Sequence, residues 1–138
     1  MKDCIFCQIV SGKIPSELIS EDNSTLAFLD INPVRPSHTL IIPKAHHETL
    51  QDLPADLMGK LMNKAQKVAR GLLKAGETEG YNLFSNNHKC SGQAIPHFHY
   101  HLVPRRTGDG ITFQWKTGTY RDEDMKAWGK RIREALEE

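Results

Sequence analysis

Short runs of apolar and β-branched residues, each bounded by turn residues or proline, predict five β-strands along the chain. The strands are expected at residues 17–20, 25–31, 38–42, 81–85 and 98–103. In the second of these, Leu26, Phe28 and Asp30 alternate with residues of the opposite face, so one side of the strand is expected to be mostly apolar.

Between the third and fourth strands the apolar period changes from two residues to three or four, which predicts a long amphipathic helix. The helix is expected to begin with Pro54 in its first turn and to stop at Gly76. Its apolar side is formed by Leu57, Leu61, Ala65, Val68 and Leu72. One or two helical turns are expected over residues 4–10, and a C-terminal helix over residues 121–136. Strands on both sides of one long helix predict an α+β fold with a mainly antiparallel sheet.

Composition limits the classes of protein to consider. A chain of 138 residues is expected to form a single domain, and 38% hydrophobic with 25% charged residues argues against disorder. No apolar run approaches the roughly 20 residues that span a bilayer, so no membrane partner is expected. Lysine and arginine number 18 against 17 acidic residues, which gives no electrostatic reason to expect nucleic acid.

The cysteines point to metal or redox chemistry. There are three, Cys4, Cys7 and Cys90, and no apolar signal segment stands before the first. We therefore expect a reducing, cytoplasmic location, where a close Cys-x-x-Cys pair favours a metal or redox site over a structural disulfide.

Three alternating histidines in the fifth strand are the most informative feature. His97, His99 and His101 are expected to project from one face of the strand about 7 Å apart. Phe98, Tyr100 and Leu102 would then pack beneath the long helix. Two chemistries suit such a platform. The imidazoles could bind a catalytic metal, or one of them could attack an electrophile such as phosphorus while its neighbours bind the oxygens.

The loop before the fifth strand favours attack on phosphorus over binding of a catalytic metal. Gly92 permits close approach of the backbone to an anion, and Gln93 and Asn86 offer neutral amide donors. A catalytic zinc would instead call for further acidic or histidine ligands.

With these motifs the sequence resembles the histidine triad (HIT) family, whose hallmark is His-apolar-His-apolar-His-apolar-apolar. Phe98, Tyr100, Leu102 and Val103 fill the apolar positions. The resemblance implies a half-barrel α+β fold that pairs into a homodimer. It also implies a nucleotide hydrolase or transferase that cleaves at the α-phosphate through a nucleotidyl-histidine intermediate. The whole chain, residues 1–138, is interpreted as one HIT domain, with a core over about 3–106 and a C-terminal segment over about 107–138.

Carried over by position, the resemblance implies that His99 is the nucleophile. His101 would bind a phosphate oxygen and help the leaving group to depart, and His38 matches a fourth active-site histidine. Asn86, Gln93 and the backbone near Gly92 would support the developing negative charge.

The resemblance also implies a purine nucleoside site. Asp30 matches the residue that accepts hydrogen bonds from the ribose hydroxyls. The apolar walls of the cleft would be Phe6, Ile9, Ile14, Phe28, Leu29 and Ile31, for which ordinary core packing is the alternative. The sequence departs from some family members at Ala94, where they carry serine, and this departure bears on the leaving group.

A structural zinc site is implied as well. As in family branches that keep both cysteines, the ligands would be Cys4, Cys7, His46 and His97. The alternative is two buried free thiols and a surface histidine. For the whole protein, the leading hypothesis is an enzyme that acts on nucleoside phosphoramidates or dinucleoside polyphosphates. A purine-nucleotide-binding module without turnover and a catalytic zinc hydrolase are the alternatives.

Overall fold

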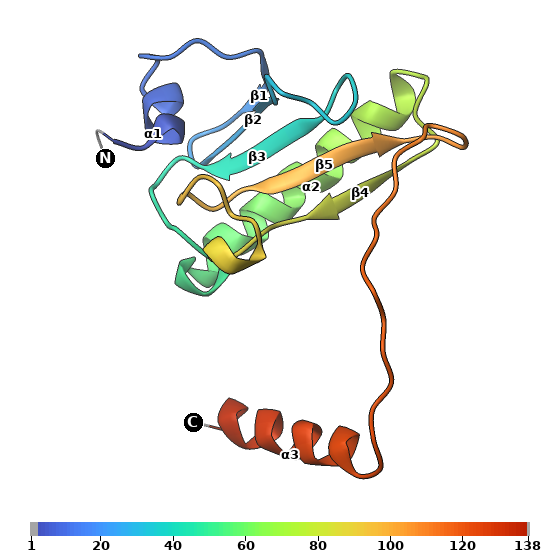
Figure 1. The fold of residues 1–138 in the computed structure, drawn as a ribbon. Coiled ribbons are helices and arrows are strands. Elements are labelled where there is room, and N and C mark those ends of the chain that lie inside the picture. The colour runs from blue at the N-terminus through green and yellow to red at the C-terminus, as the bar shows by residue number, and fades with distance from the viewer. Residues whose placement is uncertain (1–2, 138) are drawn as a thin grey trace.

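Five strands form one antiparallel sheet in the order β1-β2-β3-β5-β4 in the computed structural model, which describes residues 3–137 (Figure 1). The strands are β1 Leu18–Glu21, β2 Thr25–Leu29, β3 Thr39–Pro43, β4 Gly80–Phe84 and β5 Tyr100–Arg105. Three α-helices accompany them: α1 Ile5–Val10, α2 Ala55–Lys74 and α3 Asp124–Leu136. The predicted α+β class, the mainly antiparallel sheet and the long helix are confirmed.

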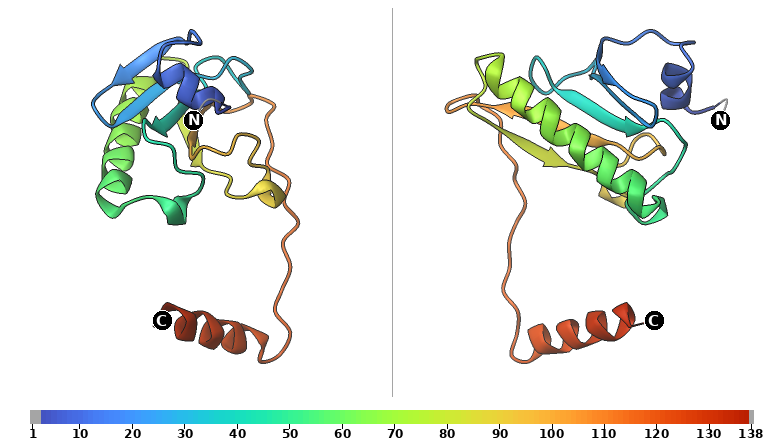
Figure 2. Two further views of the ribbon diagram at one scale, coloured as in Figure 1. Left: turned by 90° about the vertical axis from the view of Figure 1, so that its left-hand side faces the viewer. Right: turned by 180° about the vertical axis from the view of Figure 1, so that it is seen from behind.

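Helix α2 covers one face of the sheet along most of its length (Figure 2). Its predicted apolar side packs on the strands, with Leu61, Ala65, Val68 and Leu72 buried against Ile41 of β3 and other core residues. Phe98 and Leu102 lie in the same core, as the alternation of the fifth strand predicted.

The other face of the sheet carries α1 and a second apolar cluster. Phe6 of α1 packs there against Phe28, with the ring centroids 5.6 Å apart, and Leu26, Leu40 and Ile42 are buried beside it. Because α1 covers only part of this face, the strand ends beside it remain open to the cavity described below (Figure 1).

The prediction for the fifth strand was wrong at its beginning. The ladder starts at Tyr100, so only His101 of the three histidines belongs to β5. The Phe98 N–H donates to the carbonyl of His47 at 2.6 Å, outside the sheet, and this holds residues 97–99 in an irregular segment. His97 and His99 are therefore placed by loop contacts and by their own side chains.

The predicted end of this strand was also wrong, because β5 continues through Pro104 to Arg105. Pro104 lies opposite Tyr81 of β4, and its carbonyl accepts a hydrogen bond from the Arg35 guanidinium at 3.2 Å. The missing N–H of Pro104 therefore falls on the side where no strand pairs, a position at which a sheet tolerates proline. Pro43 is likewise the last residue of β3, where it pairs with Thr25.

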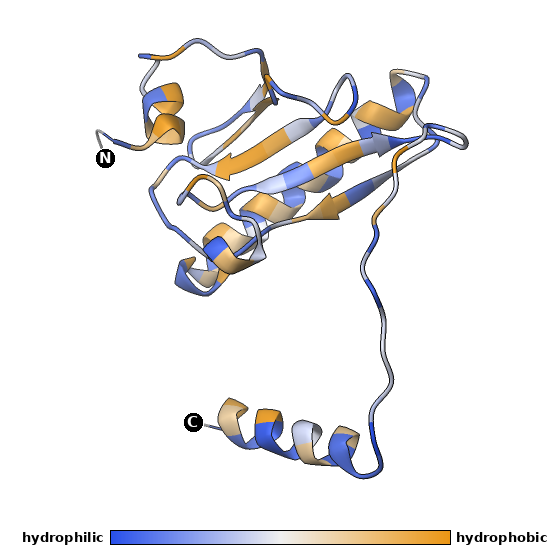
Figure 3. Ribbon diagram, viewed as in Figure 1, coloured by the Kyte–Doolittle hydropathy of each residue, from blue (hydrophilic) through white to orange (hydrophobic). Residues whose placement is uncertain are grey.

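Helix α3 stands apart from the sheet at the end of a long connector (Figures 1 and 2). It begins at Asp124, three residues later than predicted at Arg121. Its apolar side, visible in Figure 3, is exposed: Met125, Trp128, Ile132 and Leu136 keep 50–80% of their surface accessible. None of the described helices is long and apolar enough to cross a membrane.

Candidate active site and metal centre

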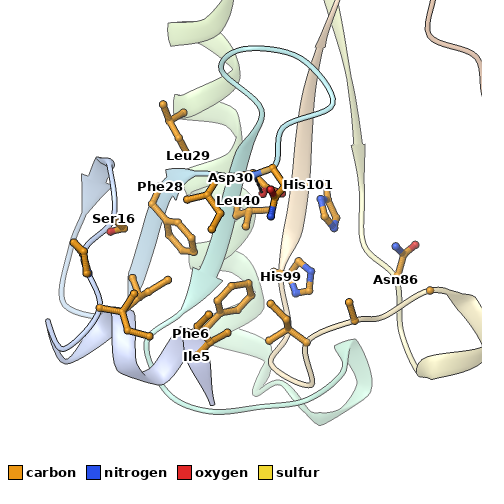
Figure 4. A pocket seen from close by; sticks show the side chains of 18 residues that line it. Ile5, Phe6, Ser16, Phe28, Leu29, Asp30, Leu40, Asn86, His99 and His101 are labelled. Carbon is orange, nitrogen blue, oxygen red and sulfur yellow. Dashed lines mark hydrogen bonds between the residues drawn. The ribbon is translucent and has the colours of Figure 1, made fainter. Parts of the chain in front are cut away.

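A cavity of about 330 Å³ opens between α1, the end of β2 and the histidine segment (Figure 4). One part of its wall is apolar and the other carries polar groups, chiefly Asp30, Asn86, His99 and His101. The remaining lining residues are Ile5, Phe6, Ile9, Ile14, Pro15, Ser16, Phe28, Leu29, Ile31, Asn32, Leu40, Gly92, Ala94 and Ile95. Such a cavity suits a ligand with a flat apolar part and an anionic or hydroxyl-rich part.

The structure brings most of the predicted binding residues to this cavity. All six predicted apolar wall residues line it, although Ile31 is 84% exposed and lies at its rim. Gln93 is placed elsewhere. Its side-chain carbonyl accepts from the His88 N–H at 2.7 Å, its amide donates to the Glu48 carbonyl at 2.6 Å, and it lines a neighbouring hollow.

His99 presents an unprotonated nitrogen to the cavity. Its Nδ1 lies 2.8 Å from the carbonyl oxygen of His97. A carbonyl only accepts, so Nδ1 must carry the proton and neutral His99 keeps a lone pair on Nε2. Burial lowers the pKa of His99, although the hydrogen bond to His97 opposes the shift, and the neutral form is thereby favoured.

His101 has the opposite tautomer, set by a short chain of hydrogen bonds. The backbone N–H of Val34 donates to Nδ1 of His38 at 3.1 Å, so neutral His38 carries its proton on Nε2. That Nε2 lies 3.0 Å from Nδ1 of His101, which must accept. His101 therefore carries its proton on Nε2, the nitrogen left for the cavity that it lines.

The same surroundings keep His38 and His101 neutral. Burial, together with the nearby His99 and His38, lowers the pKa of His101 to about 4, although Asp30 opposes the shift. Burial also lowers the pKa of His38. Protonation of His38 at Nδ1 would in addition oppose the Val34 N–H, so burial and hydrogen bonding favour the same state.

Phe84 is an active-site neighbour that the sequence analysis missed. Its ring stacks on His101, with centroids 4.7 Å apart and planes inclined by 13°. The contact arises because Phe84 pairs with His101 across β4 and β5. The sequence could have indicated this contact only through the register of β4 with β5, two strands about 15 residues apart in the chain, and composition does not reveal that register.

Asp30 lies where β2 ends, beside the histidines. One carboxylate oxygen accepts from the Asn32 N–H at 2.9 Å, and the other lies 3.8 Å from Nε2 of His38. The carboxylate lines the cavity and keeps capacity to accept from hydroxyl groups.

Gly92 is required by its backbone conformation. Its φ is +104°, and a Cβ at this position would lie 3.6 Å from Nδ2 of Asn86. The glycine therefore lets the loop turn beside Asn86, and both residues line the cavity.

A second cluster fits a tetrahedral metal. Cys4, Cys7, His46 and His97 place one ligand atom each within 4.8 Å of one another. Nδ1 of His97 lies 3.3 Å from Sγ of Cys4 and 3.6 Å from Sγ of Cys7, and Nδ1 of His46 lies 3.4 Å from Sγ of Cys7. Zinc–sulfur and zinc–nitrogen bonds of about 2.3 and 2.0–2.1 Å at a tetrahedral angle place sulfur and nitrogen about 3.5 Å apart.

The tautomer of His97 agrees with a ligand role. Its Nε2 lies 2.8 Å from the carbonyl of Pro43 and must donate, so the Nδ1 lone pair faces the two sulfurs. Unlike His99 and His101, His97 does not line the cavity; it lies in the candidate metal cluster of Cys4, Cys7, His46 and His97.

Asp30, His38 and His101 form another group with metal-ligand atoms close together. A metal on Nε2 of neutral His38 would require the proton on Nδ1, where it would face the Val34 N–H. Two donors would then oppose each other. The group is therefore better suited to hydrogen bonding, which argues against a catalytic metal held by the triad.

Comparisons with known proteins agree with this arrangement. Residues 11–108 match the HIT domain model, and the chain therefore belongs to the HIT family. It is 38% identical to protein hit of Bacillus subtilis, over 98% of this chain and 95% of that protein. It is 37% identical to an adenosine 5′-monophosphoramidase of Saccharomyces cerevisiae, over 96% of this chain and 80% of that protein. An adenylylsulfatase of Arabidopsis thaliana is 35% identical, over 90% of this chain and 61% of that protein.

Solved structures agree as well. The crystal structure of a HIT family member from Bacillus subtilis superposes with a TM-score of 0.89 at 38% identity, covering 96% of each chain. A zinc-bound histidine triad family protein from Mycobacterium smegmatis superposes with a TM-score of 0.78 at 38% identity, covering 98% of this chain and 94% of that one. The HIT fold is thus shown, and nucleotide hydrolysis is supported at the level of the family.

Proposed function

We propose that this protein cleaves purine nucleotide conjugates at the α-phosphate, in two displacements that pass through a nucleotidyl intermediate on His99. One observation carries the proposal: two adjacent imidazoles, with ring centroids 4.9 Å apart, hold opposite tautomers at one cavity. The bare Nε2 of His99 is a nucleophile, and the Nε2–H of His101 is a donor for an anionic oxygen.

In the first displacement, Nε2 of His99 forms a bond to the α-phosphorus. The bond from phosphorus to the leaving group breaks with its electron pair, and the leaving group takes up a proton from solvent. His101 donates a hydrogen bond to a phosphate oxygen and assists this departure. The positive charge that develops on the His99 ring is stabilised by the His97 carbonyl, which accepts from Nδ1–H.

In the second displacement, water attacks the same phosphorus and releases a proton to solvent, and His99 leaves with the electron pair of the phosphorus–nitrogen bond. The products are the nucleoside monophosphate and the free imidazole. Two steps replace a direct attack of water on an anionic phosphodiester, which is the gain of nucleophilic catalysis.

The remaining residues of the cavity would bind the substrate. Asp30 would accept hydrogen bonds from the ribose hydroxyls. The purine would lie against the apolar part of the wall, which is formed by Phe6, Ile9, Ile14, Phe28, Leu29 and Ile31. Asn86 and the backbone at Gly92 would donate to phosphate oxygens. Gln93 would act indirectly, since its amide braces this loop.

The family relatives suggest two kinds of leaving group. The yeast relative is a phosphoramidase and the plant relative an adenylylsulfatase. The yeast relative makes nucleoside phosphoramidates the first substrate class to test. Dinucleoside polyphosphates, which the family resemblance implies, are the second. His38 supports either reaction by fixing the tautomer of His101.

We also propose that Cys4, Cys7, His46 and His97 hold a structural zinc ion. The fit of their donor atoms and the zinc-bound mycobacterial relative support this choice of metal. The ion would cross-link α1 to the histidine segment. Thiolate ligands are kept reduced in the cytoplasm, which is where we place the protein.

The exposed apolar side of α3 supports a homodimer. Trp128 is 50% exposed and Trp115, in the connector, is 86% exposed. Packing of these residues on a second copy would bury them. Light scattering should give twice the chain mass for the wild type and a lower mass for Trp128→Asp.

Turnover of adenosine 5′-phosphoramidate tests the proposed function. We expect release of AMP by the wild type and by His47→Ala, and none by His99→Ala. AMP should still bind to His99→Ala within about tenfold of the wild-type affinity, because the nucleoside walls are intact. Binding of AMP without turnover of any conjugate by the wild type would instead favour a nucleotide-binding module.

A further inference from the structure

His97 makes two separate sets of contacts, one through its side chain and one through its backbone. Its imidazole belongs to the metal cluster, and its backbone carbonyl accepts the Nδ1–H of His99 at 2.8 Å. We propose that His97 is a positioning residue through which metal binding holds His99 in its nucleophilic tautomer. This inference rests on the role of His99 in the proposed function.

Apart from the metal cluster, the buried His97 side chain is held by its Nε2–H, which donates to the Pro43 carbonyl at 2.8 Å, and the His97 peptide makes few backbone hydrogen bonds. Residues 97–99 lie outside the sheet ladder. The backbone contacts of this segment are the Phe98 N–H to the carbonyl of His47 and the His97 N–H to the carbonyl of Ile95. His47 directly follows His46, a member of the metal cluster. Metal binding would therefore fix the segment at the His97 side chain and, through His46, at the partner of Phe98.

The orientation of the His97 carbonyl decides which nitrogen of His99 can react. With the carbonyl in place, the proton of neutral His99 lies on Nδ1 and the lone pair on Nε2 faces the cavity. If the peptide turns away, both tautomers become accessible, and the Nε2–H form has no lone pair for phosphorus. The carbonyl also stabilises the positive ring formed by the attack, so its loss would slow the first displacement.

A purely structural metal predicts a different result. Cys4 precedes α1, and Ile5, Phe6 and Ile9 of α1 line the cavity. If the cluster acted only by anchoring this helix, metal loss would weaken nucleotide binding and leave the His99 tautomer unchanged. The two roles are therefore separable by experiment.

The test compares His46→Asn with His47→Asn. These neighbouring histidines are both half-buried, but only His46 belongs to the cluster. Imidazole ¹⁵N NMR reports the tautomer of each histidine, and the His99 signals are assigned by their absence in His99→Gln. Metal content, AMP affinity and the single-turnover rate of nucleotidyl transfer to the enzyme are measured on the same samples.

We expect His47→Asn to match the wild type, with metal bound and a single Nδ1–H tautomer at His99. His46→Asn should lose the metal, show both tautomers and transfer the nucleotidyl group about tenfold more slowly or worse. AMP affinity should stay within about threefold. A metal-free protein that keeps the single tautomer and the wild-type transfer rate would overturn the proposal.

Metal-free wild type, prepared with a chelator below its unfolding temperature, provides the same comparison if His46→Asn does not fold. The sheet amide signals show whether either sample is folded. The tautomer is measured without turnover, so a wild type that is inactive on every conjugate would refute the proposed function and still report whether the metal positions His99.

Discussion

Nε2 of His38 lies 3.0 Å from Nδ1 of His101, and the Val34 N–H determines which of the two imidazoles donates. One backbone amide in the loop between β2 and β3 thereby sets the tautomer of a side chain in β5. We expect His38→Leu, which removes the donor, to lower kcat/KM by about 10–100-fold because His101 no longer presents Nε2–H uniformly.

The conservative variant separates this effect from lost packing. His38→Asn keeps an amide donor and should recover part of the rate. His88→Asn, an exposed histidine in the loop after β4, should behave as the wild type. Equal rates for His38→Leu and the wild type would show that the hydrogen bond from His38 to His101 has no part in turnover.

Activity should persist well below the ordinary pKa of histidine. Burial lowers the pKa of His101 to about 4 and also lowers that of His38, so both remain neutral where a solvated imidazole is protonated. The midpoint of the decrease in kcat/KM on the acid side should therefore lie below pH 6.5. A decrease of kcat/KM with a midpoint at pH 6.5 or above would contradict the assignment of neutral His38 and His101.

The same shifts affect stability. In the unfolded chain His101 gains its proton near pH 6.5, whereas in the folded protein it does so near 4. The unfolded state then binds more protons between these values, so the free energy of unfolding should decrease as pH falls from about 6.5 to 4. Urea titrations at fixed pH should show this decrease, and His101→Phe should reduce it.

Phe84 should matter for catalysis through His101. We expect Phe84→Leu to raise the pKa of His101, because the stacked ring that excludes water is lost, and to lower kcat more than it raises KM. NMR titration of His101 and steady-state kinetics measure the two effects. Leu83→Ala, at a more exposed position of the same strand, is the matched control, and an unchanged His101 pKa in Phe84→Leu would refute this role.

Asp22 should stabilise the fold through buried Lys64. Nζ of Lys64 lies 3.2 Å from the Asp22 carboxylate and donates to Oγ of Ser20 at 2.7 Å. Asp22→Asn leaves a buried cation without its counter-ion, and we expect a loss of about 2 kcal/mol, because Asp22 is half-exposed and its charge is partly screened.

The surface pair of Glu21 and Lys44 is the control. Their charged atoms are 2.6 Å apart, and Glu21→Gln should cost less than about 1 kcal/mol. Burial raises the pKa of the Asp22 carboxyl, but hydrogen bonds from Ser24, Thr25 and Lys64 outweigh it and hold the pKa well below its usual range. This contribution should therefore be lost as pH falls below about 4. Equal free energies of unfolding for Asp22→Asn and Glu21→Gln would contradict the proposed contribution of the Asp22–Lys64 pair.

Local patterns in the sequence predicted most of the fold, and the structure places four of the predicted polar site residues, Asp30, Asn86, His99 and His101, at one cavity. The period of α2 and the alternation of β2 follow from residues near one another in the chain, so both elements were predicted, although β2 ends at Leu29 and not at residue 31. The alternating histidines were predicted to share one strand face, but His97 and His99 both precede the ladder, and His97 lies with the two cysteines, as the family resemblance implied.

What the sequence could not reveal depends on contacts between distant segments. The tautomers of His38 and His101 depend on Val34, and the stacking of Phe84 depends on the register of β4 with β5. The amide of Gln93 was expected to support charge, but Glu48 and His88 engage it in the structure. A hydrogen-bond partner of this kind is set by tertiary geometry rather than by residue type.

Detection of a nucleotidyl-histidine intermediate tests most directly whether His99 is the nucleophile. The wild type is mixed with adenosine 5′-phosphoramidate, quenched within one turnover and analysed by mass spectrometry of the intact chain and of its peptides. We expect an adenylyl adduct on the His99 peptide, absent in His99→Ala and present in His47→Ala. Rapid turnover of the substrate with no adduct on His99, or with the adduct on another histidine, would contradict the assignment of the nucleophile.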